Sequence, residues 1–143
     1  IGSYIEPHAP FREANVAGLG TMHGFLRRAG YRMPDGPDFA RAVGQFARDT
    51  NRQLEAQGRG ACVDDTFRQA LSLLDINVTT EHWPGALWSY YGVIQRFVLP
   101  VAGDARGVLH ELSEAGLLFG PLSHTRWRPT PHDADLGGAG IGE

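Results

Sequence analysis

The sequence predicts a mostly α-helical fold, in which a bundle of four helices precedes a short α/β segment. Apolar residues recur at three- and four-residue steps through residues 11–99, with short polar turns between the periodic stretches, which is the pattern of packed amphipathic helices. Pro100 then marks a boundary, and a helix, a glycine and a short apolar run follow it, an order typical of α/β architecture. We therefore expect a loop and linker at 1–10, a helical bundle at 11–99 and an α/β segment at 100–143.

The first two helices are predicted at residues 11–29 and 38–57. Gly30 closes the first helix, because glycine is the residue most often found just beyond a helix end. The second helix is expected to begin at Pro37 or Asp38 and to end in the glycine-containing stretch that follows it. The expected inner stripes are Val16, Leu19, Met22, Leu26 and Ala29 in the first helix, and Phe39, Val43, Phe46, Thr50 and Leu54 in the second.

The third helix is predicted at residues 64–74 and the fourth at 80–97. Asp64 or Asp65 is expected to cap the third helix, since an aspartate oxygen accepts hydrogen bonds from the free N–H groups of a first turn. The fourth helix tolerates Pro84 only because the proline falls in its first turn. The expected inner residues are Phe67, Leu71 and Leu74 in the third helix, and Trp83, Leu87, Tyr91, Ile94 and Val98 in the fourth.

Beyond the boundary proline the pattern changes to a helix at 103–115, Gly116 and a strand at 117–123. The strand ends in Ser-His-Thr, so polar groups stand at its tip. A single parallel strand is not stable alone and needs neighbouring strands. Pro121 lies inside the strand and cannot donate a backbone hydrogen bond, so we expect a bulge or a distorted strand at this point.

Composition narrows the class of protein. The formal net charge is −3, so there is no electrostatic case for binding nucleic acid or an anionic membrane. All 13 basic residues are arginines. No apolar run approaches the roughly 18–20 residues that span a bilayer. A single cysteine, Cys62, allows no internal disulfide and fits a reducing compartment. We expect a cytoplasmic protein.

Two stretches together resemble the haloacid dehalogenase (HAD-like) hydrolase superfamily. "LPVAGDARGVLHELSEAGLLFGPLSHTRW" at 99–127 is similar to the second-motif region of that family, where a proline, a helix, a glycine and a strand ending in Ser or Thr follow in this order. "IGSYIEP" at 1–7 is similar to the end of its first motif. By this resemblance residues 11–99 are the mobile helical cap, and 100–143 are part of a Rossmann-like core. The chain then looks like a fragment of a longer protein.

The resemblance implies a Mg²⁺-dependent phosphatase that acts on a small phosphorylated metabolite. An aspartate directly before Ile1 would attack the phosphoryl group and form an aspartyl-phosphate, and the backbone carbonyl of Gly2 would reach the metal. Ser123 matches the hydroxyl that binds a phosphate oxygen, with His124 beside it. Arg126 either meets the anionic substrate or lies in a solvated loop. The family's lysine and metal-binding acids would lie after the end of this chain, so the 143-residue chain alone is expected to be inactive.

Departures from the family pattern keep other functions open. Gly2 stands where most phosphatases of the family carry a second aspartate, and Tyr4 stands where a threonine or serine is usual. The alternatives are a dehalogenase, which needs no Mg²⁺, and a non-catalytic helical binding module or degenerate relative of the hydrolases. Two further aromatic residues of the fourth helix, Trp88 and Tyr90, are left open between the core and a substrate cleft. Of the remaining candidates, His23 is isolated, His82 is interpreted as a surface residue of the fourth helix, and Cys62 is assigned no catalytic role. The His132–Asp133–Asp135 group is interpreted as a helix N-terminus rather than a metal site.

Overall fold

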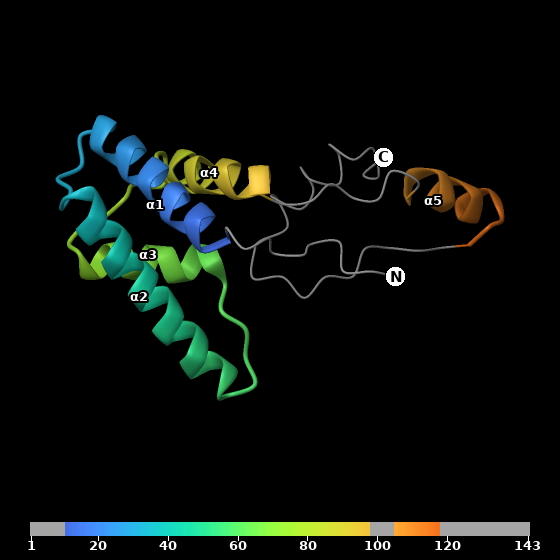
Figure 1. Cartoon of the computed structure of the whole chain (residues 1–143), viewed down its shortest axis with the longest axis horizontal. Helices are drawn as coiled ribbons and strands as arrows, with labels where there is room; N and C mark the ends of the chain where they lie inside the picture. Colours follow the sequence, from blue (N-terminus) through green and yellow to red (C-terminus); the bar gives the residue numbers. More distant parts are fainter. Residues whose placement is uncertain (1–10, 98–104, 118–143) are drawn as a thin grey trace.

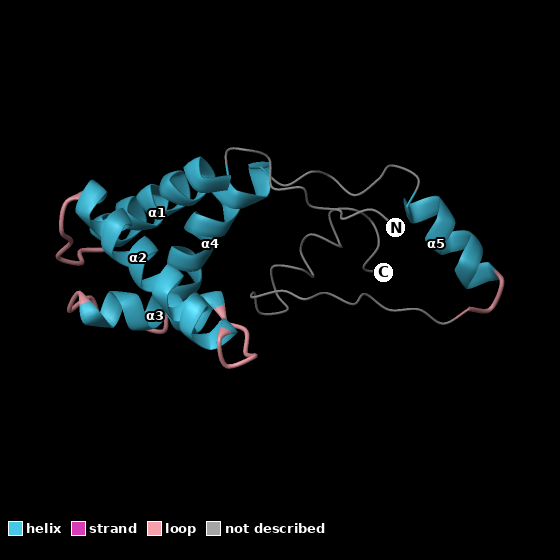
Figure 2. Cartoon of the chain, turned by 60° about the horizontal axis from the view of Figure 1, so that its bottom comes forward, coloured by secondary structure: helices cyan, strands magenta, loops and turns pink. Residues whose placement is uncertain are grey.

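The computed structural model describes residues 11–97 and 105–117, and every regular element within them is helical (Figure 1). The elements are α1 (Phe11–Arg28), α2 (Gly36–Glu55), α3 (Val63–Leu73), α4 (Trp83–Ile94), a 3-10 turn (Gln95–Phe97) and α5 (Ala105–Glu114). The prediction of a mostly α-helical fold is therefore confirmed for the described residues (Figure 2). Of the predicted strand at 117–123 they include only Leu117, which belongs to no strand, and the rest lies outside them.

The first and last helices of the bundle, α1 and α4, pack against each other in antiparallel directions. Asn15 near the start of α1 bonds Tyr90 near the end of α4. Phe25, farther along α1, lies against Gly85, close to the start of α4. Because positions rise along one helix as they fall along the other, the start of α1 and the end of α4 lie at the same end of the bundle (Figure 1).

The core lies between these two helices and the α2–α3 pair, and most of the predicted inner residues belong to it. Val16 is an exception, since it is 56% exposed. The buried stripe of α1 begins instead at Ala14, which places Val16 on the outer side of the helix. The predicted inner residues of the second half of α2 are only half-buried, because that end extends beyond α3 (Figure 1). The largest fully buried side chains are Phe39, Met22, Leu26, Leu71 and Val43.

Three helix starts differ from the predictions. α2 begins two residues early at Gly36, because the side chain of Asp35 caps it by accepting a hydrogen bond from the Asp38 N–H at 2.8 Å. Neither predicted aspartate caps α3, whose N-cap is Cys62 and makes no side-chain hydrogen bond. α4 begins at Trp83 rather than at residue 80, after a turn whose Thr79 carbonyl accepts from the Trp83 N–H at 3.0 Å.

Helices α1 and α3 both end in a residue with a left-handed backbone conformation, which the sequence indicates by a glycine only for α1. Gly30 has a φ of +90° beyond α1, and the N–H of Tyr31 donates to the Leu26 carbonyl at 3.1 Å. The same pattern closes α3, where the N–H of Ile76 donates to the Leu71 carbonyl at 2.9 Å. Here the left-handed position is held by an aspartate, Asp75, with a φ of +58°. An L-residue with a side chain is strained in this conformation, and glycine is not.

Replacing Asp75 with glycine should therefore stabilise the bundle. We expect the free energy of unfolding to rise by about 0.5–1 kcal/mol, because the left-handed conformation costs glycine nothing sterically. Chemical denaturation of the 143-residue chain measures the change. Asp75→Ala is the control, since it removes the same carboxylate without relieving the backbone, and equal stability of the two variants would contradict the prediction.

The contact between α1 and α4 is close at Gly18. A Cβ placed on this residue would lie 2.7 Å from Tyr90 Cδ2 and 3.2 Å from the Tyr90 carbonyl oxygen. Tyr90 is buried and cannot move into solvent. Gly20, two residues farther along the same helix, has no heavy atom within 4 Å of the corresponding position. The two glycines thus differ in packing although they share one helix.

Gly18→Ala and Gly20→Ala should shift stability in opposite directions. The added methyl at position 18 forces the helices apart, and we expect a loss of about 1–3 kcal/mol in the free energy of unfolding. The methyl at position 20 meets only open space and improves helix propensity, so a gain of about 0.5–1 kcal/mol is expected. Thermal unfolding followed by circular dichroism compares them, and a stable Gly18→Ala variant would refute the close packing.

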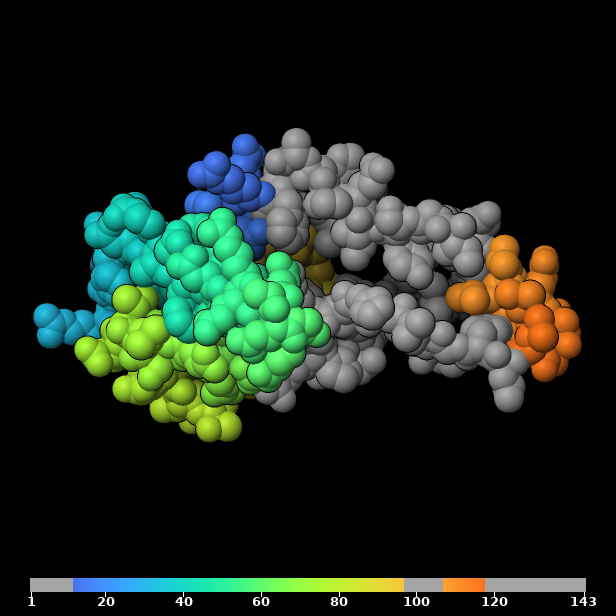
Figure 3. Space-filling model, turned by 90° about the horizontal axis from the view of Figure 1, so that it is seen from below, coloured from blue at the N-terminus to red at the C-terminus, as the bar shows by residue number. Residues whose placement is uncertain are grey.

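The last described helix, α5, lies apart from α1–α4 (Figures 1 and 3). It begins at Ala105 and ends at Glu114, against the predicted 103–115, and Gly116 just beyond it has a φ of +79°. Its apolar side chains Val108 and Leu112 are exposed, as is Leu117 just after it. Within 11–97 and 105–117, none of the helices combines the length and apolar character that crossing a membrane requires.

Candidate functional site

Asp64, in the first turn of α3, is a buried acid that accepts hydrogen bonds from two side chains of the described helices. It is 7% exposed. The indole Nε1–H of Trp83 donates to its Oδ2 at 3.1 Å, and the Nε–H of Arg68 donates to its Oδ1 at 3.1 Å. Asp64 or Asp65 was predicted to cap this helix, whereas Asp64 turns inward to α4. The pairing is physically consistent, because a buried carboxylate needs both hydrogen bonds and a compensating charge.

Arg68 is fixed by this acid and by the face of the indole. Its Cζ lies 4.2 Å from the centroid of the Trp83 ring, a distance at which a guanidinium is attracted to an aromatic face. Its side chain is nevertheless 43% exposed. The guanidinium is thus oriented by the protein and still accessible from solvent.

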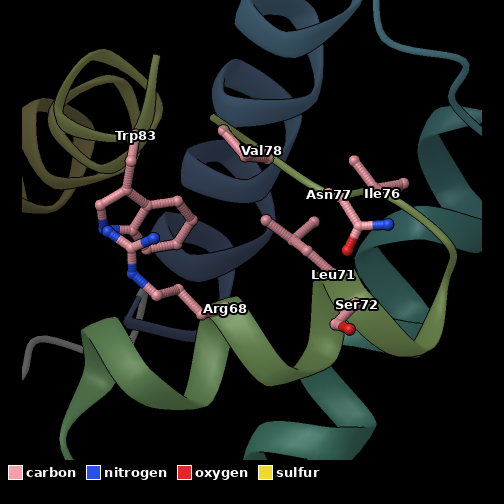
Figure 4. A pocket seen from close by; sticks show the side chains of 7 residues that line it. All are labelled: Arg68, Leu71, Ser72, Ile76, Asn77, Val78 and Trp83. Atoms are coloured by element: carbon pink, nitrogen blue, oxygen red, sulfur yellow. The ribbon is translucent and has the colours of Figure 1, made fainter. Parts of the chain in front are cut away.

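A groove of about 190 Å³ begins at this arginine. Figure 4 shows Arg68 and Trp83 on one side of it and Ser72 and Asn77 on the other, with Leu71 and Val78 between them. No acidic side chain is among its lining residues. These come from α3, from the connection to α4 and from the first residue of α4: Arg68, Leu71, Ser72, Ile76, Asn77, Val78 and Trp83.

A second hollow of about 420 Å³ lies where α1 turns into α2. His23 Nε2 is 2.9 Å from the Pro34 carbonyl oxygen, so the ring donates a hydrogen bond to that carbonyl through this nitrogen. The hydroxyl of Tyr31, at its edge, bonds the Thr79 backbone N–H at 3.0 Å and His82 Nδ1 at 3.0 Å. His82, interpreted from the sequence as a surface residue, therefore helps to join the α1–α2 connection to the α3–α4 connection.

The two aromatic residues left open by the sequence have different environments. Tyr90 is buried and bonds Asn15, and its ring meets Phe67 edge-on at 4.8 Å between centroids. Burial raises the pKa of the Tyr90 hydroxyl above its ordinary value, so this group stays protonated and donates. Trp88 is 40% exposed and meets Tyr91 edge-on. Tyr90 is thus a core residue, while Trp88 remains at the surface.

The residues that the resemblance assigns to the site lie outside the described ranges. These are Gly2, Ser123, His124 and Arg126, and the His132–Asp133–Asp135 group lies outside them as well. Among residues 11–97 and 105–117, no three His, Cys, Asp or Glu side chains are placed to hold a metal ion. No family model, curated protein or solved structure matches this chain.

The groove beside Arg68 is the part of the structure that sequence reasoning missed. The four-residue spacing of Asp64 and Arg68 on one helix was a usable signal, because side chains at i and i+4 lie on the same face. Trp83 is 19 residues away from Asp64 along the chain. Nothing local in the sequence indicated that its indole would be the second partner.

Asp64→Ala should destabilise the bundle more than removal of an exposed acid. The change leaves the buried indole N–H of Trp83 without its acceptor, at a cost of about 1–3 kcal/mol in the free energy of unfolding. Asp49→Ala is the matched control, because Asp49 is exposed on α2 and its loss should change stability by less than about 0.5 kcal/mol. Urea denaturation compares the variants, and similar midpoints would show that the buried pair is not stabilising.

Proposed function

We propose that the chain is a segment of a HAD-like hydrolase in which α1–α4 form the helical cap. The observation that supports this proposal is the antiparallel contact of α1 and α4, in which Asn15 meets Tyr90. This contact brings the start of α1 and the end of α4 to one end of the bundle. Insertion of one domain into another is favoured where the two ends of the inserted domain lie close together. Helix α5 and Gly116 follow the bundle in the order that the resemblance requires.

In this proposal the parent protein is a phosphatase that acts on a small phosphorylated metabolite. An aspartate at the position before Ile1 is the nucleophile, and Ser123 donates a hydrogen bond to the phosphoryl group as charge develops on it. His124 and Arg126 lie beside that group. Mg²⁺ supplies charge neutralisation when bound, with the Gly2 carbonyl as one ligand. The remaining ligands and a lysine belong to later motifs of the family.

The proposed protein works in the cytoplasm on a small molecule and binds neither nucleic acid nor membrane. The formal charge of −3 and the single cysteine support these statements. A second candidate is a relative of the hydrolases that has lost catalysis and binds a ligand. The glycine at position 2, where the family usually carries an aspartate, favours this candidate. A dehalogenase shares the nucleophile and is the third.

Phosphate release from a panel of small phosphomonoesters, with and without Mg²⁺, tests the proposal. The protein is produced with the residues that flank this sequence in its gene. We expect metal-dependent release, and Ser123→Ala should lower kcat/KM by about 10²-fold because one donor to the developing charge is lost. Ser89→Ala is the control, since the Ser89 hydroxyl bonds the Ala86 carbonyl within α4.

Three outcomes separate the candidates. Release that Ser123→Ala does not change would remove the assigned role of that serine. Halide release from haloacids without phosphate release would indicate a dehalogenase. Neither activity from a folded protein would favour the non-catalytic relative and overturn the phosphatase proposal.

A further inference from the structure

We propose that the groove beside Arg68 binds a small oxyanion, either a phosphate or a carboxylate group. Arg68 donates to Asp64 only through Nε. Its two terminal nitrogens, Nη1 and Nη2, have no hydrogen-bond partner within the part of the chain that the structure describes. These nitrogens form the edge of the guanidinium that binds phosphate or carboxylate with two parallel hydrogen bonds.

Two further polar side chains, Ser72 and Asn77, line the groove on the side opposite Arg68. Ser72 is four residues after Arg68 on α3, so both side chains lie on one face of the helix. Asn77 stands beside Ser72 across the groove from Arg68 (Figure 4). Neither side chain makes a hydrogen bond to another described residue. The Ser72 hydroxyl and the Asn77 amide can both donate hydrogen bonds. Together with the Arg68 guanidinium, the cationic group that lines the groove, they favour an anion over a cation.

The arginine is already oriented before a ligand arrives. The Asp64 bond and the Trp83 face hold the guanidinium at the groove, so little side-chain freedom remains to be lost on binding. Asp64 also neutralises part of the charge, which keeps the affinity modest. The groove has a volume of about 190 Å³, which leaves room for a small anion such as inorganic phosphate or a short carboxylate.

This site does not depend on the proposed hydrolase. It is built on α3 and the connection to α4, and it contains none of the residues that the resemblance assigns to catalysis. Failure of the phosphatase assay would leave the site standing, and failure of anion binding would leave the phosphatase proposal standing.

Titration of the ¹⁵N-labelled 143-residue chain with sodium phosphate, sodium acetate or sodium chloride at constant ionic strength tests the site. We expect saturable shifts of the backbone amides of residues 68–78 with phosphate, acetate or both, and none with chloride. A response to phosphate alone identifies a phosphate site, a response to acetate alone identifies a carboxylate site, and a response to both identifies a general oxyanion site. Linear shifts spread over the whole bundle, or no shifts at all, would overturn the proposal.

Two kinds of variant keep the result interpretable. Arg68→Gln should weaken binding about tenfold or more, because a charge-assisted pair is lost. Arg41→Gln is the matched control, since Arg41 pairs with Asp38 at 2.8 Å on an exposed face of α2, and it should leave the affinity unchanged. Ser72→Ala and Asn77→Ala spare the Asp64–Trp83 bond, so a loss of binding in either cannot be ascribed to unfolding. Equal weakening by Arg41→Gln would show ionic screening and refute the site.

Discussion

The antiparallel contact between α1 and α4 is the constraint on which the rest of the bundle depends. The two helices approach closely because position 18 has no side chain, and the ring of Tyr90 fills the space. The Tyr90 hydroxyl would be costly to bury alone, and Asn15 satisfies it. The contact therefore joins the first and last helices of the bundle, between which α2 and α3 lie in the sequence. It also places the start of α1 and the end of α4 at the same end of the bundle.

A second polar element links the core to the surface. Asp64 is buried, yet one of its partners, Arg68, is accessible to solvent. Burying an acid is unfavourable unless its hydrogen bonds are made, and here the indole of Trp83 supplies one of them from another helix. The same arrangement that satisfies the acid also fixes the arginine at the edge of a groove. The stability of the core and the proposed ligand site thus share one set of side chains.

Prediction from sequence succeeded for the helices and less well for their starts. The apolar periodicity located α1–α4 to within a few residues, because a helix that buries one face has apolar residues at every third or fourth position. The start of α2 was predicted two residues too late, and the predicted caps of α3 were wrong. A cap and a buried acid look alike in sequence, since both place an aspartate near a helix start. Only the nearby indole distinguishes Asp64 from a cap.

The sequence by itself determined the helical character of the described residues, the glycine at the ends of α1 and α5, and the resemblance on which the hydrolase proposal rests. Those features are local, because periodicity, turn chemistry and motif order depend on residues that are close together in the sequence. The tertiary structure alone decided that Val16 faces outward, that Tyr90 is a core residue and that a groove opens beside Arg68. Each of these depends on residues that are distant in the chain and become neighbours only when the helices pack.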